Sequence, residues 1–224
     1  MSNQNDMLQE SGNKGFALYT APKLRWYDLV VTQVSNRLAW RCPPSTIIDW
    51  YQQHAAVTHA DVGPGTGYYL DQCGVSFQSL ALLDASADAL THAAKRLARF
   101  NPISQRVNVL DAEQIAQVTL RFDSIGLNYV LHCLPGSLQE RKAEVLASLG
   151  NLLNPKGVIF GATLLGDLPH NLPARALIGL YNGNGVFSNM QDTLSSLTHT
   201  LNANYSDVQI KVVGSVALFA ARKS

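Results

Sequence analysis

Apolar residues along the chain form two alternating patterns, short continuous runs and longer runs with helical spacing. The continuous runs, which are typical of buried strands, lie at residues 60–62, 79–83, 107–110, 122–127 and 158–164. Between them, apolar side chains recur every three or four positions, as on the covered face of an amphipathic helix. Because parallel strands need crossover helices that cover their sheet, this alternation predicts a doubly wound α/β domain.

Both ends of the chain extend this prediction. Residues 16–40 have apolar side chains at helical intervals, and the Pro43-Pro44 pair ends that segment because proline cannot continue a helix. Near the C-terminus, residues 208–213 and 215–221 are two strand-like runs about a glycine, which predicts a hairpin. We therefore expect a mostly parallel seven-stranded sheet with an antiparallel last strand, plus N-terminal helices.

The chain divides into segments of different composition. Residues 1–15 are mainly polar, which predicts disorder, and residues 16–44 are expected to form a helical cap. Residues 45–224 form the sheet domain, with a helix expected at residues 138–153 before the fifth strand. Within this domain, residues 165–190 are loop-like and contain aromatic side chains, so we expect them to form a lid over a binding site.

A glycine-rich run follows the first predicted strand. Val62 ends the strand, and Gly63, Gly65 and Gly67 follow at every second position. Glycine allows positive φ and lets a ligand approach the main chain without meeting a Cβ. The fingerprint of NAD-binding folds is G-x-G-x-x-G, whereas here an acidic residue, Asp61, precedes a shorter G-x-G-x-G. The spacing therefore favours a ligand other than a nicotinamide dinucleotide.

Polar residues follow the other predicted strands. Asp84 ends the second strand, Asp111 the third, and Asn128 follows the fourth. In open parallel sheets, ligands bind beyond the carboxyl ends of the strands. Carboxylates and amides at that edge can accept hydrogen bonds from ribose hydroxyls, an adenine amine and an ammonium group. Asp84 and Asp111 would each also suit a helix cap, but their occurrence at successive strand ends favours ligand binding.

The ordered set of motifs resembles the class I S-adenosylmethionine-dependent methyltransferases over about residues 45–165. The resemblance implies an S-adenosyl-L-methionine cofactor, an S-adenosyl-L-homocysteine product and no metal. The matching segments are HADVGPGTG at 59–67 for the first motif, LLDAS at 82–86 for the second, VLDA at 109–112 for the adenine segment, FDSI at 122–125 with LNYVLH at 127–132 for the fourth strand and its turn, and LLNPKG at 152–157 for the turn into the fifth strand.

The same resemblance implies roles for individual residues. It assigns Asp84 to the ribose hydroxyls, and Asp111 with the backbone N–H of Ala112 to adenine. Tyr27, in a Tyr-Asp pair, is similar to a residue placed over the methionine carboxylate, although helix packing explains it equally well. The expected cofactor-binding residues are Tyr27, Asp61, Gly63, Gly65, Gly67, Asp84, Ala85, Asp111, Ala112 and Asn128.

Methyl transfer from a sulfonium is an in-line displacement, so the protein mainly aligns the reacting atoms. His132, just beyond the fourth strand, is the candidate general base, the alternative being packing or a bond to a backbone carbonyl. We expect Trp26, Tyr181 and Phe187 to contact the substrate, with Trp40 beside them, although both tryptophans could instead lie in the core.

Composition excludes several partners. Charged residues make up 15% of the chain and the formal net charge is +1, which speaks against nucleic acid and anionic membranes. No apolar run approaches the roughly 18 residues of a membrane span, and the N-terminus lacks an apolar signal region, so we expect a cytoplasmic protein. We expect it to be a monomer or a homodimer. The three cysteines lack C-x-x-C spacing and are expected to be free, buried thiols.

The departures from parts of the family narrow the function. No Asn/Asp-Pro-Pro-Tyr/Phe motif follows the fourth strand, and no acidic metal cluster of the catechol-type enzymes is present. The sequence therefore favours a methyltransferase that acts on an O, N or C atom of a small organic, specialised metabolite. Two other classes remain open: a methyltransferase of protein or RNA, and a noncatalytic cofactor-binding subunit.

Overall fold

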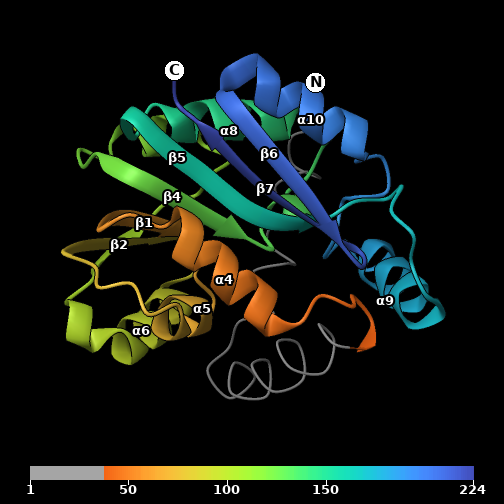
Figure 1. The fold of residues 1–224 in the computed structure, drawn as a ribbon, viewed down its shortest axis with the longest axis horizontal. Helices are drawn as coiled ribbons and strands as arrows, with labels where there is room; N and C mark the ends of the chain where they lie inside the picture. The colour runs from red at the N-terminus through yellow and green to blue at the C-terminus, as the bar shows by residue number, and fades with distance from the viewer. Residues whose placement is uncertain (1–37) are drawn as a thin grey trace.

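A computed structural model describes residues 38–224. The strands of this part of the chain are β1 (Thr58–Val62), β2 (Ser79–Asp84), β3 (Ile103–Arg106), β4 (Phe122–Asn128), β5 (Leu153–Leu164), β6 (Ser206–Val213) and β7 (Val216–Arg222). They form one seven-stranded sheet in the order β3-β2-β1-β4-β5-β7-β6 (Figure 1). Strands β1 to β5 pair in parallel, and β7 runs antiparallel to both β5 and β6. The predicted doubly wound sheet with an antiparallel last strand is confirmed.

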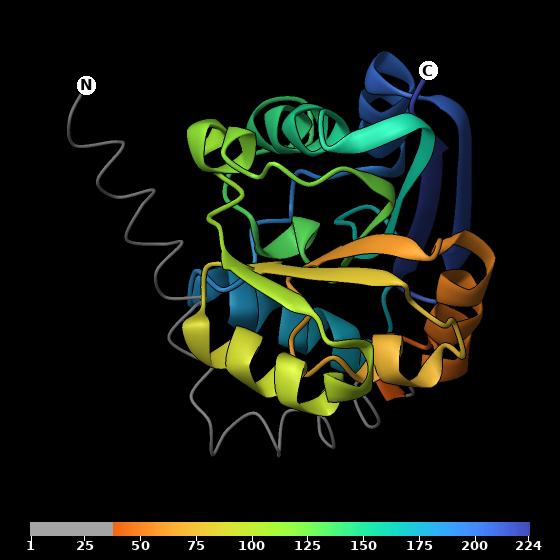
Figure 2. The ribbon, with the colours of Figure 1, turned by 90° about the vertical axis from the view of Figure 1, so that its left-hand side faces the viewer.

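Helices cover both faces of the sheet (Figure 2). On one face lie α4 (Pro44–His54), α5 (Tyr68–Gln72), α6 (Ala87–Arg96) and α9 (Leu172–Gly183), and on the other lie α7 (Ala112–Ala116), α8 (Arg141–Gly150) and α10 (Leu194–Asn204). Successive side chains of a central strand enter opposite cores, as Leu82 and Leu83 of β2 do. This two-sided burial explains why the central strands are continuous apolar runs.

Several predicted element boundaries are wrong. The third strand is not at residues 107–110 but at Ile103–Arg106, an edge strand with mostly exposed side chains, so hydrophobicity did not mark it. The helix expected at residues 138–153 ends at Gly150, and β5 already begins at Leu153. The turn predicted at residues 154–157 is instead a bulge within β5, where Lys156 has a φ of 64°.

The terminal predictions have different outcomes. The hairpin about Gly214 is confirmed, because β6 and β7 pair directly on either side of it. The helices expected before residue 38, with the candidates Trp26 and Tyr27, lie outside the described residues. Cys42 and Cys73 are buried free thiols as predicted, whereas the free thiol of Cys133 is partly exposed. Between residues 38 and 224, no helix is long and apolar enough to cross a membrane.

The centre of the sheet is its topological switch point. Strands β1 and β4 are neighbours there, and the chain proceeds from β1 toward β3 on one side and from β4 toward β5 on the other. In open sheets of this kind, ligands bind beyond the carboxyl ends of the strands at the switch point. The loop after β1 and the residues after β4 therefore meet at the predicted site.

Candidate active site

The chain turns sharply after β1. Gly63, Gly65 and Gly67 have φ values of 63°, 55° and 73°. A Cβ on Gly63 would lie 2.7 Å from Cγ2 of Val130, so the turn requires glycine where it passes the segment after β4. A Cβ on Gly65 would meet no atom within 4 Å, so the backbone there borders open space. This loop presents main chain that a ligand can approach closely.

Asp61 lies beneath the glycine loop and exposes only 2% of its surface. Its Oδ2 accepts a hydrogen bond from the Tyr51 hydroxyl at 2.6 Å and lies 3.4 Å from Nε2 of His59. Gly126, which pairs with Asp61 in β4, leaves room for the carboxylate, because a Cβ there would be 2.9 Å from Oδ2. The structure thus fixes a carboxylate at the switch point.

Asp84 ends β2, the strand next to β1. The backbone N–H of Ser86 donates to its Oδ1 at 2.8 Å. Burial raises the pKa of Asp84 to about 6, with a smaller contribution from the charge of Asp61, while the N–H groups of Ser86 and Ala85 oppose the shift. Apart from these two backbone N–H groups, no donor contacts this carboxylate within the described part of the chain, so its remaining lone pairs are available to ligand hydroxyls.

Asp111 caps a helix rather than ending a strand, because β3 stops at Arg106. Its Oδ1 accepts the backbone N–H groups of Glu113 and Gln114, and its Oδ2 accepts Nε2 of Gln114 at 2.8 Å. These bonds, chiefly the backbone N–H of Gln114, hold the pKa of Asp111 below its usual value. The capping alternative is therefore realised. The cap does not use the N–H of Ala112, and the contact of both residues with adenine stays a prediction.

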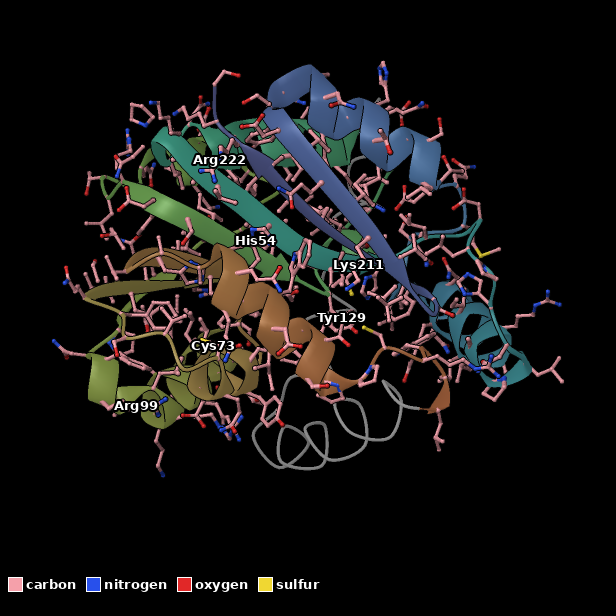
Figure 3. The ribbon with its side chains drawn as sticks, in the orientation of Figure 1. His54, Cys73, Arg99, Tyr129, Lys211 and Arg222 are labelled. Atoms are coloured by element: carbon pink, nitrogen blue, oxygen red, sulfur yellow. The ribbon has the colours of Figure 1, made fainter. Side chains whose placement is uncertain are left out.

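Asn128 ends β4 on the same face as Gly126, and it is 8% exposed. Among residues 38–224, neither its amide oxygen nor its amide nitrogen makes a hydrogen bond of good geometry, although the side chain lies close enough to the Tyr51 hydroxyl to oppose slightly the rise that burial causes in that tyrosine's pKa. An unsatisfied buried polar group costs about 1–3 kcal/mol, which a ligand that pairs with it would recover. The next residue, Tyr129, has a φ of 58° and marks the turn out of β4, at the end of the sheet remote from Arg222 (Figure 3).

His132 lies in the short 3-10 helix η3 (Leu131–Cys133) and exposes 2% of its surface. Its Nδ1 is 3.4 Å from both Oγ1 of Thr163 and the backbone nitrogen of Leu164. Burial, together with the positive charge of Lys142, lowers the pKa of His132 to about 3. The imidazole is therefore neutral at physiological pH.

An aromatic row begins at His132. The centroid of the Phe187 ring lies 4.5 Å from that of His132, and Tyr181 lies 4.8 Å from Phe187. The structure thus brings together three of the predicted catalytic and substrate residues. Residues 165–190 are not mainly loop as predicted, since α9 occupies their centre and carries Tyr181. Trp40 is buried in the core, which realises its core alternative.

Two buried polar clusters were not predicted. The first joins Tyr51, His59 and Ser124 to Asp61, and its only signal in the sequence is a histidine two positions before Asp61 on the same strand face. In the second, Nζ of Lys142 on α8 contacts the Asp192 carboxylate. Neither cluster could be assembled from local sequence, because its members come from distant segments.

Comparisons with known proteins agree with this geometry. A family model described as a methyltransferase domain matches residues 60–159. The chain is 36% identical over 191 residues to the putative uncharacterized protein YbcY of Escherichia coli (strain K12), covering 84% of this chain and 97% of that protein. It is 32% identical over 223 residues to demethylluteothin O-methyltransferase of Streptomyces thioluteus, covering 98% and 96%. The structure of a DhpI–SAH complex matches with a TM-score of 0.66 and 14% identity, covering 95% and 97%.

The parallel sheet with its antiparallel last strand and glycine loop at the switch point defines a class I methyltransferase fold. The chain belongs to the methyltransferase family, and it is an S-adenosylmethionine-dependent enzyme. Its cofactor is S-adenosyl-L-methionine.

The chain's own residues fit this cofactor. The unpaired amide of Asn128, the accessible lone pairs of Asp84 and the bare main chain at Gly65 lie at the carboxyl ends of three adjacent strands, β4, β2 and β1. Together they supply hydrogen-bond acceptors, hydrogen-bond donors and open space, which the amino-acid, ribose and adenine parts of the cofactor require. Which atom contacts which part of the cofactor stays a prediction for each of them.

Proposed function

We propose that this enzyme methylates an oxygen atom of a small, uncharged aromatic metabolite. The observation that carries the proposal is the row of His132, Phe187 and Tyr181, whose rings form an aromatic wall with a neutral imidazole. Such a wall suits a flat organic acceptor. The similarity to demethylluteothin O-methyltransferase supports an oxygen acceptor of specialised metabolism.

In this mechanism the chain's residues bind and orient. Bound S-adenosylmethionine supplies an electrophilic methyl group on a sulfonium. Asp84 accepts hydrogen bonds from the ribose hydroxyls, and Asp61 and Asn128 hold the amino-acid end. The aromatic row aligns the acceptor oxygen with the methyl group, which is the main requirement of an in-line displacement.

We expect the purified protein to convert phenolic metabolites to methyl ethers with stoichiometric formation of S-adenosylhomocysteine. A panel of phenols, matched amines, a peptide mixture and total RNA, followed by mass spectrometry, measures this preference. Methylation of amines alone would show that the acceptor atom is nitrogen rather than oxygen. Methylation of peptide or RNA alone would place the enzyme in a macromolecular class. Cofactor binding without turnover on any of them would favour a noncatalytic subunit.

We also propose that His132 contacts the acceptor hydroxyl. Nδ1 faces Thr163 and Leu164, which leaves Nε2 for the acceptor. The backbone N–H of Leu164 donates to Nδ1, so the neutral imidazole carries its proton on Nε2 in this structure. To act as a base, the ring has to adopt the other tautomer, in which Nδ1 donates to Oγ1 of Thr163 and Nε2 can take the proton that the acceptor releases. A pKa of about 3 makes this a weak base, and the contribution should be moderate.

His132→Gln is expected to lower kcat by about tenfold to a hundredfold, at or below the lower end of general-base catalysis, with little change in acceptor KM. The matched control is Phe187→Leu, which alters the aromatic wall without removing a proton acceptor and should mainly raise KM. Steady-state kinetics at pH 6 to 9 measure both variants. If His132→Gln lowers only the melting temperature and leaves kcat unchanged, the packing alternative holds.

A further inference from the structure

Asp61 is a buried carboxylate that has no lysine or arginine partner among the described residues. Its Oδ2 accepts the Tyr51 hydroxyl and faces His59. A buried charge is expensive unless it is paired as well as hydrogen-bonded. Among the described residues, the place of a lysine or arginine beside Asp61 is therefore open to a cationic group of a ligand.

The proton positions around His59 follow from hydrogen-bond chemistry. A carboxylate only accepts hydrogen bonds, so the nitrogen of His59 that faces Asp61, Nε2, carries the proton. Nδ1 is then an acceptor, 2.8 Å from the hydroxyl of Ser124. That hydroxyl in turn accepts the backbone N–H of Ala56 at 2.7 Å. Ala56, Ser124 and His59 thus form a series of hydrogen bonds in which each group donates to the next and the last donates to Asp61.

Packing holds both donors in place. The His59 ring lies between the rings of Phe77 and Phe160, with centroids 5.3 and 5.7 Å away and nearly parallel planes. Burial, with the charge of Asp61, raises the pKa of Tyr51 well above its usual value, so its hydroxyl stays protonated and donates. Both donors act on Oδ2.

The other oxygen of Asp61 has a different role. Across residues 38–224, Oδ1 has no hydrogen-bond partner, and Gly126 keeps the space beside the carboxylate free of a Cβ. One oxygen is thus held by the protein, and the other remains for a ligand. The amino-acid end of the cofactor carries an ammonium group, which supplies a positive charge.

We propose that Tyr51 and His59 are positioning residues that hold Oδ2 of Asp61 and orient its carboxylate toward the ammonium group of the cofactor. This inference rests on the proposed function in one respect, the assignment of Asp61 to the amino-acid end. Neither residue touches the cofactor itself. Their effect should therefore be confined to ligands that carry the amino-acid end.

The test compares S-adenosylhomocysteine with 5′-methylthioadenosine, which has the adenosine and thioether but lacks the amino-acid end. By calorimetric titration, Tyr51→Phe should weaken binding of S-adenosylhomocysteine about tenfold and that of methylthioadenosine less than about twofold. The matched control is Tyr205→Phe, which removes another buried tyrosine hydroxyl, one that donates to the Leu146 carbonyl on the other face of the sheet. It should leave both affinities unchanged.

Gly126→Ala provides a second variant if Tyr51→Phe does not fold, because its Cβ would lie 2.9 Å from Oδ2 of Asp61 and 3.3 Å from Nε2 of His59 and so disturb their contact while both side chains remain. The same selective loss is expected. An equal loss for both ligands, or no loss for either, overturns the positioning role. If the unaltered protein binds both ligands with equal affinity, the assignment of Asp61 to the ammonium fails. Binding of neither ligand by the folded protein would instead contradict the cofactor site.

Discussion

Asp84→Asn is expected to weaken S-adenosylhomocysteine binding by at least about tenfold and to stabilise the ligand-free protein at pH 7. The binding loss follows because an amide is a poorer acceptor for two ribose hydroxyls than a carboxylate. The stability gain follows because burial raises the pKa of Asp84 from 3.8 to about 6, so its charge opposes folding. Removing that charge is worth about 1–3 kcal/mol. Calorimetric titration and urea unfolding measure the two effects.

The pH dependence of stability distinguishes an effect of the Asp84 charge from a general disturbance of the fold by the substitution. A folded-state pKa above the unfolded value means that Asp84 contributes stability below about pH 4, and that this contribution is lost as the pH rises through about 6. Asp84→Asn and the unaltered protein should therefore converge in stability near pH 4 and differ above pH 6. Binding by the unaltered protein should weaken below pH 6, where Asp84 gains a proton. The control is Asp88→Asn, an exposed carboxylate on α6. A stability difference that is constant with pH would contradict the explanation.

The features that could be predicted from sequence are those that local chemistry determines. Central strands β1, β2 and β4 are buried on both faces, so their apolar runs are unmistakable. The glycines after β1 and the aspartate that ends β2 are likewise recognisable because their neighbours in sequence are their neighbours in space. Edge strand β3 has little to bury, and periodicity consequently misplaced it.

The features that could not be predicted depend on distant contacts. Tyr51 and Asp61 meet only because α4 packs against the central strands. On α8, Lys142 stands four residues after Leu138 and three before Val145, which places it on the buried face. That position indicates a buried charge, but it does not identify Asp192, fifty positions away, as the partner.

The Lys142–Asp192 pair ties the segment that contains Phe187 and Ser188 to helix α8. Lys142 has no exposed surface, and its Nζ donates to the Ser188 carbonyl at 2.6 Å as well as to Asp192. Asp192 also accepts the backbone N–H of Leu138 at 3.0 Å. Next to it, the N–H of Ser188 donates to the carbonyl of His132 at 2.7 Å. These bonds place Phe187 against the His132 imidazole, so the ion pair supports the aromatic row.

Lys142→Met is expected to lower the free energy of unfolding by about 3–5 kcal/mol, because it leaves the Asp192 carboxylate buried without a cation. Lys142→Met combined with Asp192→Asn should recover part of that loss, since asparagine is neutral and can still accept the N–H of Leu138. Urea unfolding of the two single variants and the double variant gives the coupling energy. The matched control is Lys95→Met, an exposed lysine on α6, which should change stability by less than about 0.5 kcal/mol.

The same variants test whether the Lys142–Asp192 ion pair contributes to acceptor binding. A loosened Ser188 would let Phe187 move away from His132, so the double variant should show a raised acceptor KM and an unchanged affinity for S-adenosylhomocysteine. The ion pair lies beside the aromatic row rather than at the switch point, so the two readouts are separable. A double variant with normal stability and normal acceptor KM would show that the pair contributes to neither. If the cofactor affinity falls while the acceptor KM rises, the segment that contains Phe187 and the cofactor site form one cooperative unit.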